Sequence, residues 1–278
     1  MVSTFTAAEA KLAFAAKLKE SGLTPADGAR LHLTLLTPTQ TRALSASFFA
    51  AWSIKLPYHD VRGKVNGFYR LRYMGDPRPA TGFAARTTEK QPRYVQAPDT
   101  EPHVYLPPLP ADATFGWSQI LSDAAVPLLI TEGELKAACA VTRAFPTLGL
   151  GGVWSWRAAK RGIKLIEPLA SAAWRARRVH IVFDSDSASN PHVQRAIQAL
   201  CVELTSRGAL PFTVRLPSLA NLAKTGLDDF LVHGSSDDLR ALIADIGKEE
   251  LTPKATRPET VMIAPVSGSE MISKLTFG

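Results

Sequence analysis

Two short apolar runs that end in carboxylates constrain this chain more than any other feature. The first run, at 126–131, leads directly into Glu132 and Gly133. The second, at 179–183, leads into Asp184 and Asp186. Continuous apolar runs of this length fit strands that are buried on both faces, as in a parallel sheet covered by helices. The pattern therefore predicts an α/β fold.

The acids at the ends of these runs predict a cation site. Ligands of open α/β sheets bind at the carboxyl ends of the strands. Asp184 and Asp186 stand two residues apart, so both point to one side, where they repel each other unless a cation neutralises them. Oxygen ligands of this kind favour Mg²⁺ or Mn²⁺, with Glu132 as a third ligand. The alternatives are ordinary ones, since Asp-Ser-Asp-Ser is also turn composition and Glu132 also suits a helix dipole.

Two further charged residues follow Glu132 in the same segment. We expect Glu134 to complete a capping box with Thr131 at the start of the next helix. Lys136 lies one turn after Glu132, so it either pairs with that glutamate or reaches a phosphate group.

Four motifs in a fixed order resemble those of a known family. They are Ile130-Thr-Glu-Gly-Glu-Leu-Lys-Ala137, the glycine-rich stretch 148–156, Phe183-Asp-Ser-Asp186 and Gly226-Leu-Asp-Asp-Phe-Leu231. Together they resemble the TOPRIM-like domain of phage and plasmid replication proteins, within the superfamily that includes bacterial primases. The resemblance covers roughly residues 50 to 235. It implies a TOPRIM-like, Rossmann-type parallel sheet with helices on both faces and a catalytic acidic site.

The resemblance also assigns residues. It implies that Glu132, Asp184 and Asp186 are catalytic and bind the metal. It adds Asp228 and Asp229, from the last motif, as further metal ligands. Both of these also sit at an expected helix start, where the helix dipole stabilises acids whatever their function.

The local patterns divide the chain into four segments. Residues 1–52 form an N-terminal helical segment, with helices expected from the capping box at Thr6 to Glu20 and at about 38–51. Residues 53–120 form a β-hairpin and loop-rich subdomain, with strands at 53–58 and 65–73 and short strands at 93–95 and 103–106. Residues 121–247 form the TOPRIM-like catalytic domain, and residues 248–278 a flexible C-terminal tail or linker. Within the catalytic domain we expect strands at 126–131, 146–150, 178–183 and 210–216, and helices at 133–145, 163–176, 189–207, 227–233 and 236–246.

The charge balance points to an anionic partner. The formal net charge is +7, and nucleic acid is the leading partner, although many basic proteins bind none. Lysine and arginine dominate phosphate contacts. The candidate nucleic-acid-binding residues are Arg70, Arg72, Lys136, Arg157, Lys160, Arg161 and Lys164. The alternative is a solvated basic face without a partner.

The cysteines, the longest apolar run and the N-terminal sequence indicate the cellular compartment. Cys139 and Cys201 are the only cysteines, and they fit small core residues in a reducing compartment better than a disulfide or a zinc site. The longest uncharged apolar run, 43–52, is too short to span a bilayer, and the N-terminus does not have a signal-peptide pattern. We therefore expect a cytoplasmic protein with no membrane partner.

The expected function is primase-type nucleotidyl transfer during replication of a phage or plasmid. The protein would bind Mg²⁺ or Mn²⁺, nucleotides and single-stranded DNA, with a replicative helicase or another replisome protein as partner. One alternative is a TOPRIM nuclease that cuts DNA or RNA with the same acids. Another is a non-catalytic nucleic-acid-binding module of a replisome.

Overall fold

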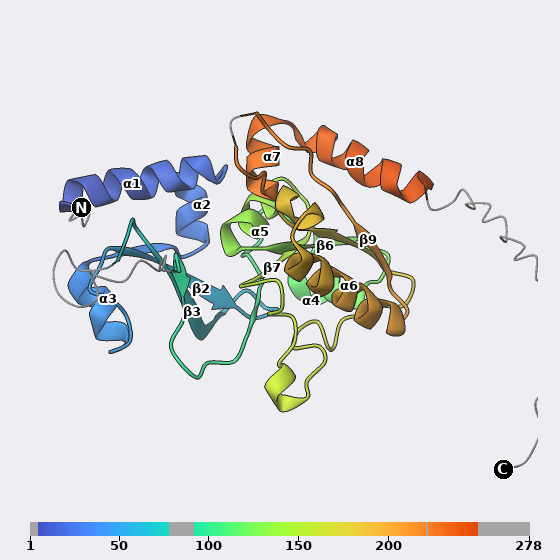
Figure 1. Cartoon of the computed structure of the whole chain (residues 1–278), viewed down its shortest axis with the longest axis horizontal. Coiled ribbons are helices and arrows are strands. Elements are labelled where there is room, and N and C mark those ends of the chain that lie inside the picture. Colours follow the sequence, from blue (N-terminus) through green and yellow to red (C-terminus); the bar gives the residue numbers. More distant parts are fainter. Residues whose placement is uncertain (1–4, 78–91, 221, 250–278) are drawn as a thin grey trace, which may run out of the picture.

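The computed structural model describes residues 5–77, 92–220 and 222–249 (Figure 1). Within them the chain forms two sheets, with the N-terminal helices and the first sheet on the left of Figure 1. The elements of the first part are α1 (Ala7–Glu20), α2 (Pro25–Arg30), β1 (Thr34–Leu36), α3 (Pro38–Leu44), β2 (Ser53–His59), β3 (Val65–Tyr73) and β4 (Tyr94–Val95). The elements of the second part are β5 (Val104–Tyr105), α4 (Trp117–Ser122), β6 (Leu128–Glu132), α5 (Glu134–Val141), β7 (Thr147–Leu150), η2 (Ala159–Arg161), β8 (Arg178–Val182), η3 (Ser185–Ala188), α6 (Pro191–Ser206), β9 (Leu210–Thr213), α7 (Leu227–His233) and α8 (Ser236–Glu249).

The first sheet is antiparallel, in the order β1-β2-β3-β4. Threonines at positions 6, 24 and 37 begin the three helices beside it, each through a capping box. These caps satisfy backbone N–H groups that have no partner inside the helix. The strand β1 belongs to the segment 1–52, so that segment contributes to the sheet as well as to the helices.

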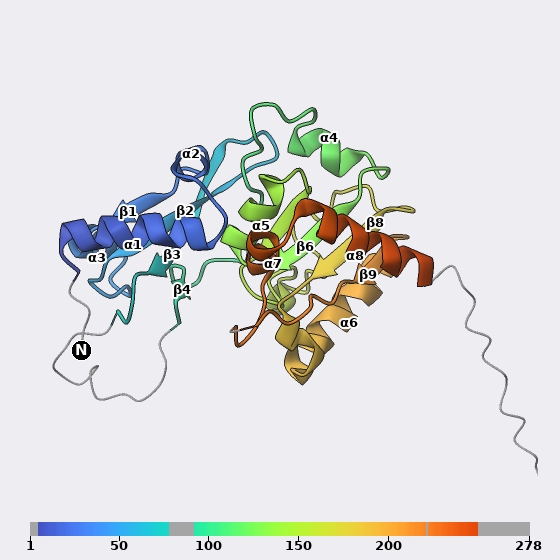
Figure 2. The same ribbon diagram turned by 90° about the horizontal axis from the view of Figure 1, so that it is seen from above.

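The second sheet has the order β5-β7-β6-β8-β9, in which β5 alone among the described strands is antiparallel. Alternate residues of the central strand β6 face opposite layers. Leu128 and Ile130 pack in one cluster with α4 and α6, and Leu129 packs in another with α5 and α7. Figures 1 and 2 show α7 and α8 on one side of this sheet and α6 on the other. The predicted parallel sheet with helices on both faces is therefore confirmed.

Some predicted helices are absent or shorter. The helix expected at 163–176 does not form, and turns occupy that stretch. Pro168 explains this, because proline inside a helix removes a hydrogen bond and clashes with the preceding turn. The helix expected at 133–145 ends at Val141, shortly before Ala144 adopts a left-handed φ of 62°. The stretch expected as helix 38–51 ends at Leu44.

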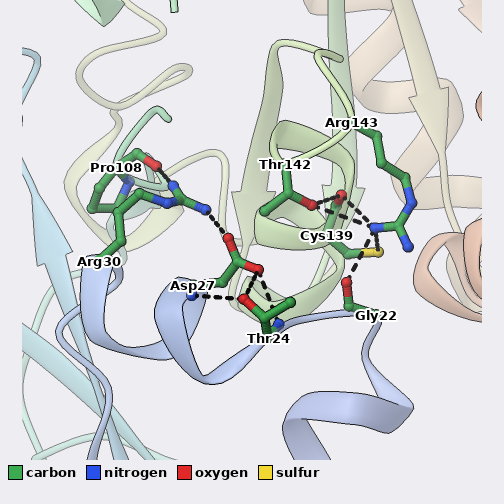
Figure 3. Close-up of polar contacts among 8 residues, drawn as sticks. All are labelled: Gly22, Thr24, Asp27, Arg30, Pro108, Cys139, Thr142 and Arg143. Carbon is green, nitrogen blue, oxygen red and sulfur yellow. Dashed lines mark hydrogen bonds and ion pairs between the residues drawn. The ribbon is translucent and has the colours of Figure 1, made fainter. Parts of the chain in front are cut away.

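The two parts share one hydrophobic core. Leu56 and Tyr58 of β2 belong to the same buried cluster as Leu135 and Ala138 of α5. Polar contacts add to this packing, as Figure 3 shows. Arg143, two residues after α5, donates to the Gly22 carbonyl oxygen at 3.2 Å. Arg30 of α2 donates to the Pro108 carbonyl oxygen and pairs with Asp27 at 2.9 Å (Figure 3).

No helix among the described residues combines the length and the apolar character that crossing a bilayer requires. The C-terminal segment expected to be a linker, 248–278, lies almost wholly outside the described residues.

Candidate functional site

Three predicted metal ligands line one cavity at the carboxyl ends of the central strands. The strands β6 and β8 are parallel neighbours, with Thr131 opposite Val182. Glu132 and Asp184 therefore follow at the same edge of the sheet. Helix α7 brings Asp228 to this edge, and all three acids line a cavity of about 390 Å³. The structure brings the first two acids together because both stand at strand ends of one parallel sheet.

Asp184 is buried between two lysines. Its side chain is 5% exposed, and Lys136 of α5 and Lys224 of the β9–α7 loop both pair with it. The Nζ of Lys224 lies 2.7 Å from Oδ2, and Lys136 contacts Oδ1. Burial disfavours the charged carboxylate, yet these two ammonium groups lower the pKa of Asp184 below its ordinary value. Asp184 is therefore held ionised.

Asp228 meets Asp184 across Gly226. A Cβ built on Gly226 would lie 2.9 Å from Oδ1 of Asp228 and 3.3 Å from Oδ1 of Asp184. Only a residue without a side chain leaves these carboxyl groups and the Lys136 stem room to converge. Burial raises the pKa of Asp228, partly offset by Lys136. The Thr225 N–H donates to Ser185 Oγ at 2.8 Å, which ties this loop to the end of β8.

Glu134 does not cap its helix, which corrects the sequence prediction. The N-cap of α5 is Gly133, with φ of 106°, and Thr131 Oγ1 is buried with no hydrogen-bond partner among the described atoms. Glu134 instead turns inward, where its Oε1 accepts from Arg70 Nη1 and from Tyr58 Oη, each at 2.7 Å. The abrupt turn at Gly133 prevents Thr131 from reaching the first turn of the helix. Glu134 thus links α5 to β2 and β3.

The cavity lining is rich in charge and in unpaired polar atoms. Its charged residues are Lys17, Arg70, Arg72, Arg93, Glu132, Glu134, Lys136, Asp184, Lys224 and Asp228. Positive side chains outnumber acids, which favours an anionic ligand. Ser21 Oγ, Arg70 Nε, Arg72 Nε and Glu134 Oε2 are buried without a hydrogen-bond partner in the described part of the chain. Because buried polar groups are normally paired, these atoms indicate a site for a polar ligand or water.

The carboxylate oxygens of the cavity are of the type that binds a divalent cation. Carboxylates are the ligands that Mg²⁺ and Mn²⁺ prefer, and Glu132, Asp184 and Asp228 supply them. The described side chains nevertheless contain no group of three or more His, Cys, Asp or Glu placed to hold one ion. Lys136 and Lys224 now provide the positive charge at Asp184.

Of the other two predicted metal ligands, only Asp229 has a side chain among the described residues. Asp229 accepts a hydrogen bond from the Gly226 N–H at 2.8 Å and is not among the residues that line the cavity. It therefore caps α7, and we leave it out of the proposed ligands. Asp186 lies in η3, and its side chain falls outside the described residues.

The predicted nucleic-acid-binding residues separate into two groups. Arg70, Arg72 and Lys136 line the cavity. The other residues, Arg157, Lys160, Arg161 and Lys164, follow β7 and are not part of its lining. In that group the guanidinium of Arg157 lies 4.1 Å from the ring centroid of Trp154, and Lys160 and Lys164 are exposed.

Sequence reasoning missed three cations of the cavity. Lys17 lies in α1, Arg93 just before β4, and Lys224 two residues before Gly226. Lys224 could be predicted from the sequence, because it lies next to the acidic motif of α7. Lys17 and Arg93 could not, since only the packing of the N-terminal part against α5 brings them to the site.

Comparisons with known proteins agree with the fold. A family model described as "Domain of unknown function (DUF3854)" matches residues 116–238. No curated protein matches the chain. Among solved structures, the chain resembles the Aquifex aeolicus primase (zinc binding and RNA polymerase domains) with a TM-score of 0.52 and 14% identity over 86% of this chain. It spans 56% of that structure.

Two further primase structures are similar. The E. coli primase catalytic core has a TM-score of 0.53 and 15% identity, over 88% of this chain and 78% of the core. The RNA polymerase domain of Mycobacterium tuberculosis primase DnaG has a TM-score of 0.54 and 13% identity, over 85% of this chain and 76% of that domain. The chain therefore shares the fold of primase catalytic cores.

Proposed function

We propose that this protein is a primase-type nucleotidyltransferase that extends a primer on single-stranded DNA with Mg²⁺ or Mn²⁺. The observation that carries the proposal is the cavity in which Glu132, Asp184 and Asp228 meet an excess of lysines and arginines. Acids that hold a cation, next to bases that hold phosphates, suit phosphoryl transfer, which needs positioning and charge more than a side-chain nucleophile. The fold of primase cores supports the same reading.

Each group has a separate task in this proposal. Glu132, Asp184 and Asp228 would hold the cation, which when bound neutralises charge on the phosphate oxygens. Arg72 and Arg93 would hold the triphosphate, because guanidinium groups bind phosphate in a bidentate manner. Arg70 is already committed to Glu134, so it shapes the wall of the cavity. The exposed Lys160 and Lys164 would contact the template backbone.

We place this activity in the replication of a phage or plasmid, with a replicative helicase as partner and the cytoplasm as its location. The order of the four sequence motifs supports the phage or plasmid setting and the helicase partner, and the two cysteines without a disulfide pattern support the cytoplasm. Asp186 stays a proposed ligand on the grounds of these motifs.

A non-catalytic nucleic-acid-binding module is the second candidate. It is favoured by the two lysines on Asp184 and by the lack of a group of three metal ligands among the described side chains. A buried acid that is already neutralised has no need of a cation.

One assay separates these functions. The protein is incubated with single-stranded DNA, Mg²⁺ or Mn²⁺ and labelled nucleotides. Extended products that Asp184→Asn abolishes support the primase proposal. Shortened DNA indicates a nuclease that uses the same acids, and a mobility shift without either product indicates the binding module.

A further inference from the structure

Lys136 and Lys224 neutralise Asp184 from two different elements. Lys136 extends from the first turn of α5, and Lys224 from the loop before α7. Their target is 5% exposed, whereas the Lys136 and Lys224 side chains are 21% and 54% exposed. A buried carboxylate without compensation is strongly unfavourable, so the described structure needs these ammonium groups.

The side chain of Lys136 passes close to two glycines. A Cβ on Gly226 would crowd it, 2.7 Å from Lys136 Cε, whereas a Cβ on Gly133 would make an ordinary contact, 3.7 Å from Lys136 Cδ. The aliphatic stem therefore passes between the Glu-Gly motif and the α7 motif. Both glycines belong to the motifs that supply the acids. The same two motifs therefore position the acids and the side chain of Lys136.

A divalent cation and the two ammonium groups compete for the same oxygens. Lys136 contacts Asp184 Oδ1, the oxygen that lies 3.3 Å from a Cβ built on Gly226, and Lys224 contacts Oδ2. A cation bound to this carboxylate would stand within a few ångströms of both lysines, where like charges repel strongly at low dielectric. Lysine has a flexible four-carbon stem, so each ammonium can leave without a change in the backbone.

We propose that Lys136 and Lys224 are displaceable internal counter-ions, which leave Asp184 when a divalent cation binds and then bind the phosphate groups of the nucleotide. This inference rests on the proposed function and extends it to an order of binding. The cavity already holds Arg72 and Arg93, which point to an anion at the same place. Before the cation binds, the lysines are engaged with Asp184. Afterwards they add two positive charges for the triphosphate.

The test measures metal and nucleotide binding separately on the full chain. Free Mn²⁺ is followed by its electron paramagnetic resonance signal in the parent and in Lys136→Met, Lys224→Met and Asp184→Asn. Binding of a non-hydrolysable nucleoside triphosphate is measured with and without Mn²⁺. Lys11→Met, which removes an exposed lysine of α1, is the matched charge control.

The proposal predicts that removing either lysine strengthens Mn²⁺ binding and weakens triphosphate binding. Removing a competing ammonium should tighten Mn²⁺ binding by at least about fivefold, and should weaken triphosphate binding in the presence of Mn²⁺ by about tenfold, as expected for one lost charged contact. Lys11→Met should change neither. In the parent, Mn²⁺ should strengthen triphosphate binding, and in the lysine variants this increase should shrink.

The possible failures are distinguishable. Equal or weaker Mn²⁺ binding in both lysine variants, with Asp184→Asn still abolishing it, overturns this inference and leaves the proposed metal site intact. Mn²⁺ binding that Asp184→Asn does not affect, or no binding in any variant, overturns the metal site and this inference with it. Should Lys136→Met fail to fold, the largely exposed Lys224 still decides the question.

Discussion

Glu134 and Arg70 form a buried ion pair, 2.7 Å between Oε1 and Nη1, that joins α5 to β3. The Glu134 side chain is 1% exposed and that of Arg70 is 12% exposed. Burial opposes the charge on Arg70, but Glu134 raises the pKa of the guanidinium above its ordinary value. Tyr58 donates to the same glutamate oxygen, and burial raises the pKa of its phenol. The pair therefore holds a cavity wall to the first sheet.

Removing one partner of this pair should destabilise the protein. Glu134→Gln leaves the Arg70 charge buried without a counter-ion, and breaking such a pair costs about 3 kcal/mol. Urea unfolding measures the free energy. Glu20→Gln, which removes an exposed partner of Lys17, should change it by less than about 0.5 kcal/mol. Replacing both partners, Glu134→Leu with Arg70→Met, should recover most of the loss. Equal stability of Glu134→Gln and Glu20→Gln would contradict the prediction.

This ion pair marks a limit of sequence reasoning. The Thr-Glu-Gly-Glu pattern from Thr131 to Glu134 satisfies the local rule for a capping box, so the sequence predicts that Glu134 caps the helix. The actual partner, Arg70, is 64 residues away and is brought to Glu134 by packing between the two sheets. No local pattern contains that information. In contrast, Glu132 and Asp184 could be placed together because parallel strands bring their carboxyl ends to one edge.

The same difference between local patterns and long-range packing explains which helices and strands the sequence predicts. The strands β6 and β8 are continuous apolar runs and the helix α6 has a helical period, so the sequence predicts all three within a few residues. The expected helix at 163–176 has apolar residues at helical spacing, but Pro168 breaks it and its apolar side chains reach the core from turns. The strand β1 has three residues, too few for a two-residue period to be distinctive.

Stability should fall in mild acid because two histidines are buried. Burial, with Arg178 nearby, lowers the pKa of His180 to about 4, and burial, with His32 nearby, lowers the pKa of His59 to about 4. Between about pH 6.5 and pH 4 the unfolded chain then binds more protons than the folded one. The free energy of unfolding should therefore decrease as pH falls through this window, by at most about 3 kcal/mol for each histidine.

His180→Phe tests this dependence. His180 is 2% exposed, stacks on Phe212, and neither ring nitrogen has a hydrogen-bond partner among the described residues. A phenyl ring keeps the stacking and cannot be protonated. Urea unfolding at pH 7.5 and pH 5 should show a smaller loss for the variant than for the parent. An identical loss would show that His180 does not contribute to the pH dependence.

The exposed basic group after β7 should bind template phosphates without regard to sequence. Lys160→Ala with Arg161→Ala should weaken single-stranded DNA binding about equally for unrelated sequences. Each lost phosphate contact reduces the slope of log affinity against log salt by roughly 0.7 for single strands, so the pair should flatten it by about 1.4. Lys11→Ala is the control. A lower affinity with an unchanged slope would mean that these residues act through structure, as the Arg161 contact with Glu101 at 3.5 Å allows.

The variant Glu132→Gln should distinguish a role in catalysis from a role in binding. A carboxylate that positions a cation or moves a proton acts mainly in the transition state, so its loss lowers turnover more than affinity. Glu132→Gln keeps the size of the side chain and removes its charge. We expect DNA binding within about twofold of the parent and nucleotide incorporation lower by on the order of 10²-fold. Glu134→Gln cannot serve as a neutral control, since it breaks the Arg70 pair, so Glu20→Gln takes that place. A parallel fall in binding and incorporation would assign Glu132 to substrate positioning, and no change in either would favour the binding module.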